Sequence, residues 1–148
     1  MVRKNTNTQK YIVAMNMNRL NPPDLTVSQW ADAERKLSAE SSAEPGRWVT
    51  ARAEYQRGIM DAVSDPAVKQ VVFIKSAQVG ATEIVGNICA FFMSQDPSPI
   101  LVIQPTLEMG QTWSKDRLAP MIRDTPALHG LVADARSRDG DNTLMHKT

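Results

Sequence analysis

The segment KSAQVGAT, from Lys75 to Thr82, carries residues suited to holding a phosphate group. Its glycine, Gly80, permits a tight backbone turn, and the hydroxyl of Thr82 is of the kind that binds Mg²⁺ in phosphate loops. If a helix begins here, its first N–H groups point toward the anion and its dipole favours negative charge. The chemistry that this pattern predicts is the binding of nucleotide phosphates together with Mg²⁺.

The segment departs at two positions from the standard phosphate-loop pattern, G-x-x-x-x-G-K-[ST]. Lys75 stands where the first glycine belongs, and Ala81 stands where the lysine belongs. The charge is thus displaced to the first residue of the loop, from which the long side chain of Lys75 can swing back over the phosphates. The nucleotide-binding residues that we expect are Lys75, Ser76, Ala77, Gln78, Val79, Gly80, Ala81 and Thr82. The alternative is an ordinary strand–loop–helix turn that binds no nucleotide, with the Lys75 ammonium in solvent.

The flanking sequence predicts the elements that must position this loop. Residues 71–74, VVFI, are β-branched or aromatic and apolar throughout, which is typical of a strand buried on both faces. A mostly apolar helix is expected over 82–93, a second buried strand over 100–103 and a third helix over about 107–122. The order strand, loop, helix, strand, helix predicts an α/β fold with a parallel sheet flanked by helices, as in a P-loop NTPase.

Two further helices are expected before the first strand. Thr26 or Ser28 can cap a helix that runs to about residue 37. Residues 52–63 carry an apolar stripe at every fourth position, which includes Tyr55. The segment between these helices, 38–46, is small and polar and predicts a loop.

Composition excludes several classes of protein. The chain has 148 residues, enough for one ordinary domain, and a net charge of +1, which gives no strong global field for nucleic acid. The single cysteine, Cys89, excludes an internal disulfide, and His129 and His146 stand alone without partners at metal-site spacing. The polar N-terminal segment lacks the apolar run of a secretory signal, so we expect a cytoplasmic protein.

The residues around the loop resemble the terminase large subunits of lambda-like tailed phages. The similarity runs from about residue 22 to about residue 126, and its motifs are Arg47-Trp48, Arg52, Tyr55-Gln56-Arg57, Met60-Asp61, Ser64-Asp65-Pro66, VVFIKSAQVGATE, DPSPILVIQPT and SKDRLAPMIRDTP. It implies a motor, oligomeric at full length, that uses ATP and Mg²⁺ to package double-stranded DNA. The implied partners are the terminase small subunit and the procapsid portal. A displaced lysine is a known variation in this family, which supports Lys75 as the phosphate-contacting charge.

The resemblance also implies roles for residues outside the loop. Tyr55 and Gln56 match the position of the family's adenine-contacting segment, where a ring can stack on the base and an amide can read its edge. The alternative for Tyr55 is a core residue of the apolar stripe. Gln104 and Thr106 follow the second expected strand, at a corner where related motors bind DNA or transmit the nucleotide state. The alternative for this corner is a plain turn.

The family's Walker B segment, an apolar strand that ends in acidic residues, has no match after residue 126, and the acidic triad of its nuclease domain has none either. We therefore expect a chain cut short before its catalytic machinery is complete. Its expected parts are an arm over 1–24, a helix and linker over 25–46, a partial P-loop ATPase domain over 47–133 and a polar tail over 134–148. A second hypothesis is a non-catalytic remnant or binding module from a decayed prophage gene.

Overall fold

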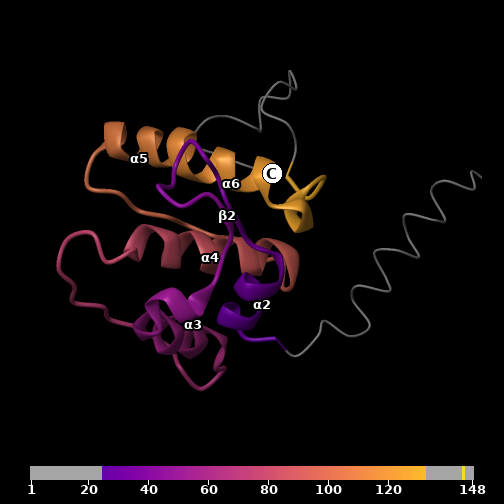
Figure 1. Cartoon of the computed structure of the whole chain (residues 1–148). Helices are drawn as coiled ribbons and strands as arrows, with labels where there is room; N and C mark the ends of the chain where they lie inside the picture. The colour runs from indigo at the N-terminus through magenta and orange to yellow at the C-terminus, as the bar shows by residue number, and fades with distance from the viewer. Residues whose placement is uncertain (1–24, 133–144, 146–148) are drawn as a thin grey trace, which may run out of the picture.

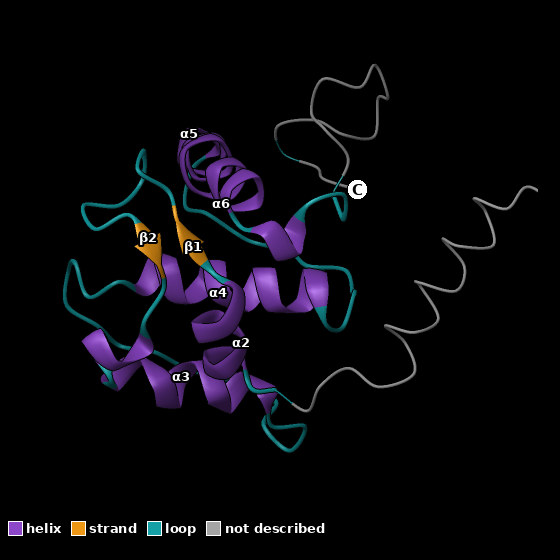
Figure 2. Cartoon of the chain, turned by 45° about the vertical axis from the view of Figure 1, so that its right-hand side comes forward, coloured by secondary structure: helices purple, strands orange, loops and turns teal. Residues whose placement is uncertain are grey.

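A computed structural model describes residues 25–132 and residue 145. The predicted arm over 1–24 and nearly all of the predicted tail lie outside the described residues. The described chain is mostly helical, with one small sheet (Figures 1 and 2). None of its helices is long and apolar enough to span a membrane.

The first described helix, α2 (Val27–Glu34), begins at the predicted cap. The Thr26 hydroxyl accepts a hydrogen bond from the Gln29 amide, and the Gln29 side chain accepts one from the Thr26 amide at 3.0 Å. This reciprocal capping box satisfies two N–H groups that a helix start otherwise leaves unpaired. The helix ends at Glu34 and not near residue 37, because Lys36–Leu37 leave it to form strand β1.

The only sheet of the described chain is the antiparallel pair β1 (Lys36–Leu37) and β2 (Gly46–Arg47). Lys36 lies opposite Arg47, and Leu37 lies opposite Gly46. The segment between the strands is the polar loop that the sequence predicts. A short 3₁₀ turn, η1 (Thr50–Ala53), follows β2 and leads into the next helix.

Two helices on either side of the phosphate loop form the centre of the fold. The predicted helix over 52–63 is observed as η1 and α3 (Tyr55–Ser64), and the predicted helix over 82–93 as α4 (Ala81–Ser94). The α4 helix lies in the middle of the molecule, with α3 on one side and the α5–α6 run on the other (Figures 1 and 2).

The last predicted helix is continuous but not uniform. It consists of α5 (Leu107–Trp113), a π-helical turn η2 (Ser114–Leu118) and α6 (Ala119–Asp124), and a 3₁₀ turn η3 (Pro126–Leu128) ends it. The Thr106 hydroxyl caps α5 by accepting a hydrogen bond from the Met109 amide at 3.2 Å. A π turn adds a residue to the helical ring and so rotates the side chains that follow it.

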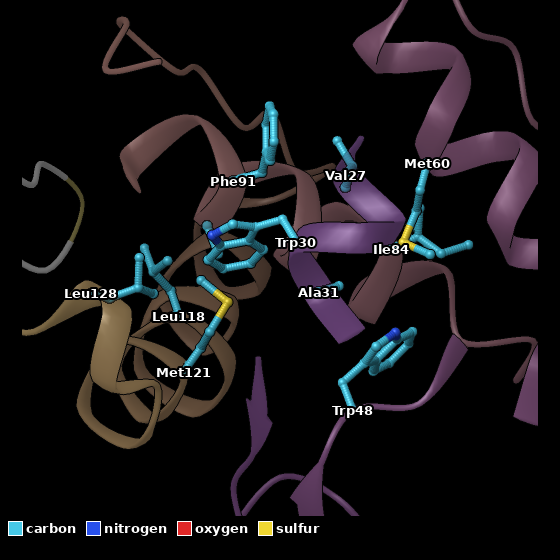
Figure 3. Close-up of a cluster of buried hydrophobic side chains, with 11 residues drawn as sticks. Val27, Trp30, Ala31, Trp48, Met60, Ile84, Phe91, Leu118, Met121 and Leu128 are labelled. Carbon is cyan, nitrogen blue, oxygen red and sulfur yellow. The ribbon is translucent and has the colours of Figure 1, made fainter. Parts of the chain in front are cut away.

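The core joins these helices around Trp30, which has no exposed surface. Its ring meets Phe91 of α4 edge to face, with 6.4 Å between the ring centroids. Figure 3 shows Leu118, Met121 and Leu128 gathered on one side of Trp30, from the helices after the loop. Burial of each such large apolar side chain stabilises the fold by roughly 1.5–3 kcal/mol. The core thereby holds α4, and the loop at its start, against α2 and α6.

The two predicted strands are not formed, and the prediction that they are buried is wrong for this structure. Residues 71–74 and 100–103 have no strand pairing within the described chain. Ile74 is 93% exposed and Leu101 is 83% exposed. A strand is stable only when a neighbouring chain pairs with its N–H and C=O groups, and neither segment has such a neighbour among the described residues. The predicted parallel sheet is therefore not observed here.

Candidate nucleotide-binding site

The loop before α4 turns sharply at two positions of positive φ. Gly80, the N-cap of α4, has φ 77° and ψ 16°, and Gln78 has φ 58°. The Gly80 carbonyl accepts hydrogen bonds from the amides of Glu83 and Ile84, each at 3.0 Å, and these bonds begin the helix. The helix therefore begins at Ala81 with Gly80 as its N-cap, one residue before the predicted start at residue 82.

The start of α4 has backbone donors that the helix itself does not use. The amides of Ala81 and Thr82 belong to the first turn, where an α-helix offers no internal acceptor, and no side chain of the described residues caps this end. Ser76, Ala77 and Thr82 are exposed. Unpaired amides beside an exposed hydroxyl are the donor set that a phosphate with its Mg²⁺ requires, so the residues present fit these groups.

Two side chains from α3 hold the loop backbone. The Tyr55 hydroxyl donates a hydrogen bond to the Val79 carbonyl at 2.9 Å, and the Gln56 amide donates to the same carbonyl at 3.0 Å. Both partners lie more than twenty residues before Val79 in the sequence. Together they tie the loop to the first turn of α3.

Gln56 explains why the residue after Val79 is a glycine. A Cβ atom at Gly80 would lie 2.5 Å from the Gln56 amide nitrogen, well inside van der Waals contact. Gly80 is thus required both by its left-handed backbone and by the close approach of α3. The Gln56 residue is 4% exposed, and its carbonyl oxygen has no donor among the described residues.

Tyr55 is 58% exposed, so it is not the core residue that the apolar stripe offered as an alternative. Its aromatic ring lies at the surface beside the loop that it contacts. A ring in this position can stack on a flat ligand whose phosphates lie at the start of α4.

Lys75 is exposed at the first position of the loop. Its ammonium donates a hydrogen bond to the Ser76 carbonyl at 3.3 Å. This contact keeps the charge beside the loop backbone. The described chain gives Lys75 no carboxylate partner that would hold its charge away from an anion.

Sequence reasoning did not predict a charged network at the first turn of α4. One oxygen of Glu83 lies 3.0 Å from Nη2 of Arg35, and the other lies 3.7 Å from Nη1 of Arg117. Burial lowers the pKa of Arg35, and the neighbouring charge of Glu83 opposes that shift. Arg35 also donates to Asn87 of α4 at 3.1 Å. No local pattern could have revealed these pairs, because 48 and 34 residues separate Glu83 from its two partners.

Comparison with known proteins identifies the family. The model for the ATPase domain of the phage terminase large subunit gpA matches residues 42–148.

This chain belongs to the gpA-type phage terminase large subunits.

Two curated relatives agree with the family model. The chain is 36% identical over 126 residues to the terminase large subunit of Enterobacteria phage P21, and 33% identical over the same length to that of Escherichia phage lambda. Each match covers 85% of this chain and 19% of the relative, so the chain spans about a fifth of the length of these terminases. No solved structure matches it.

Within this terminase chain, the structure does not join the corner at Gln104 and Thr106 to the loop. Thr106 caps α5, and Gln104 lines a cavity of about 520 Å³. Other residues of that cavity include Met93, Ile100, Val102, Trp113, Leu131 and Met145. This lining suits apolar groups and not phosphates, so we place the candidate nucleotide site at the loop and not in this larger cavity.

Proposed function

We propose that this chain binds ATP at the Lys75–Thr82 loop, as part of the ATPase of a DNA-packaging terminase. One observation carries the proposal: α4 begins at a left-handed Gly80 with first-turn amides that no described side chain caps, while Tyr55 and Gln56 hold the preceding carbonyl. This geometry presents N–H groups to an anion at the positive end of a fourteen-residue helix.

Different loop residues contact different parts of the bound nucleotide. The backbone from Ser76 to Ala81 donates to phosphate oxygens, and Lys75 supplies the cation that Ala81 cannot. The Thr82 hydroxyl is a ligand for Mg²⁺, which neutralises charge on the phosphates when it is bound. The exposure of Lys75 and Thr82 beside the turn supports these roles.

Tyr55 and Gln56 are proposed to contact adenine as well as the loop. The exposed ring of Tyr55 is suited to stacking on the base. Gln56 is the candidate to read the edge of the base with its amide, and because its oxygen is buried, the side chain must turn outward to do so.

The activity of the whole motor is a proposal that rests on membership of the terminase family. We propose that the chain acts in the host cytoplasm as part of an oligomer that works on double-stranded DNA with the terminase small subunit and the procapsid portal. Gln104 and Thr106 are candidates for DNA contact or coupling. We expect no ATP turnover from residues 1–148 alone, because they lack the acidic pair after an apolar strand that activates water.

Titration of the 148-residue chain with a fluorescent ATP analogue, with Mg²⁺ and then in EDTA, tests the proposal. Wild type should bind saturably and release the analogue to unlabelled ATP. Thr82→Ala should weaken Mg²⁺-dependent binding about tenfold or more, because the metal loses a ligand. Thr112→Ala, which alters an exposed threonine on α5, is the matched control and should bind as wild type does. Absence of saturable binding by wild type would overturn the proposal.

A further inference from the structure

The first turn of α4 carries a negative charge at the point where the proposed nucleotide site needs none. Glu83 follows the proposed Mg²⁺ ligand Thr82 directly, and it is the acidic residue of that turn. A free carboxylate here would compete with phosphate for the positive end of the helix and would repel it. A terminase that binds ATP at this loop must therefore neutralise Glu83.

Two guanidinium groups neutralise it, one for each carboxylate oxygen. Arg35, in the segment that follows α2, lies 3.0 Å from Oε2 of Glu83. Arg117, in the π turn η2, lies 3.7 Å from Oε1. The carboxylate and its two partners sum to a charge of +1. The network thus restores a positive field beside Thr82, where Ala81 supplies no lysine.

The two arginines are held very differently. Arg35 is 3% exposed and is also bound to Asn87 and to the Lys36 carbonyl, so its position is fixed by the core. The Arg117 side chain is 45% exposed, and its other contact is with the carbonyl of Ser41 in the loop between β1 and β2. Arg117 is therefore the adjustable member of the network.

Arg117 lies within the π turn. The turn interrupts an otherwise α-helical run from Leu107 to Asp124, and π turns of this kind are frequent at functional sites. Arg117 and Thr82 line the same small hollow, together with Trp113 and Leu118 from the same helical run. Among these side chains of the α5–α6 run, Arg117 is the one that pairs with a charge of the first turn of α4.

We propose that Arg117 is a positioning residue of the nucleotide site, which acts with Arg35 through Glu83 to keep the first turn of α4 and Thr82 in place for Mg²⁺-bound phosphate. The inference rests on the proposed function.

Hydrogen exchange and nucleotide titration on the 148-residue chain test this role. Arg117→Ala should speed amide exchange across 81–86 by about two- to fivefold, the effect of losing one half-exposed ion pair. Arg117→Lys should recover part of the protection, because it keeps the charge. Arg123→Ala is the matched control: it removes a guanidinium from α6 that pairs with Glu40 and Asp124 and leaves Glu83 untouched.

Titration with the ATP analogue distinguishes a role in positioning Thr82 for Mg²⁺ from a general role in stability. Arg117→Ala should weaken binding of the ATP analogue about two- to fivefold with Mg²⁺ and much less in EDTA, because Thr82 acts through the metal. The inference would be overturned if Arg117→Ala lost affinity for the ATP analogue equally with and without Mg²⁺, or if its amide exchange across 81–86 matched that of Arg123→Ala. In either case, saturable binding by wild type would leave the proposed function intact. Failure of wild type to bind the analogue would overturn both.

Discussion

The amide nitrogen of Gln56 lies 3.0 Å from the carbonyl oxygen of Val79 and fills the space into which a side chain at Gly80 would project. The first turn of α3 and the phosphate loop are therefore packed against each other, with no room for a methyl group between them. A side chain added at Gly80 is therefore expected to displace the Gln56 amide from Val79.

Gly80→Ala should destabilise the chain by about 1–3 kcal/mol, because alanine is strained at φ 77° and its Cβ meets the Gln56 amide. Urea unfolding measures the effect. Gly58→Ala is the matched control, since Gly58 lies inside α3 with open space at its Cβ position, and it should stabilise by about 0.5–1 kcal/mol. Equal effects of the two substitutions would contradict the close packing at Gly80.

Substitutions of Tyr55 test base stacking, because its exposed ring can be changed without disturbing the core. Tyr55→Phe loses the hydroxyl bond to Val79 but retains the ring, so affinity for the ATP analogue should fall no more than about threefold. Tyr55→Ala also loses the ring and should weaken binding by a further two- to tenfold or so, the range of an aromatic stacking contact. If both variants bind alike, the ring does not contact the base.

Lys75→Ala should reduce affinity for the ATP analogue by about ten- to a hundredfold, because it removes a charge-assisted contact worth roughly 1.5–3 kcal/mol. Adding Ala81→Lys to that variant should recover part of the loss, since the helix start and Gly80 remain in place. Lys69→Ala, in the exposed segment before the loop, is the control for loss of one positive charge. Equal affinities for all of these chains would remove Lys75 from the site.

Cys89 should resist alkylation in the folded chain. The residue is 3% exposed in α4, and burial raises the pKa of its thiol to about 11, so almost no thiolate exists at pH 8. We expect iodoacetamide to modify the native chain far more slowly than the urea-unfolded chain, and the native rate to rise as pH increases toward 11. Mass spectrometry of timed samples measures both rates. Comparable rates at pH 8 would show that the α4 core opens readily.

The helices and the loop could be predicted from the sequence, because the interactions that form them are local. The Thr26 cap acts within one turn, and the start of α4 at Gly80 follows from a left-handed glycine and from bonds to residues three and four positions later. A mostly apolar helix was predicted over 82–93, and it is observed as α4, although its burial depends on the helices that pack against it. The continuous helix from Leu107 was predicted, but the π turn within it was not.

Contacts between distant parts of the chain could not be predicted from the sequence, because they form only when the helices pack together. Strand formation at 71–74 and 100–103 depends on neighbours that local sequence cannot supply, and the apolar pattern there predicted burial that the structure does not have. Two sets of contacts connect residues that are 23 to 48 positions apart. They are the hydrogen bonds from Tyr55 and Gln56 to the Val79 carbonyl, and the ion pairs of Glu83 with Arg35 and Arg117. Such contacts depend on how the helices pack around Trp30, and the type and spacing of single residues do not encode that packing locally.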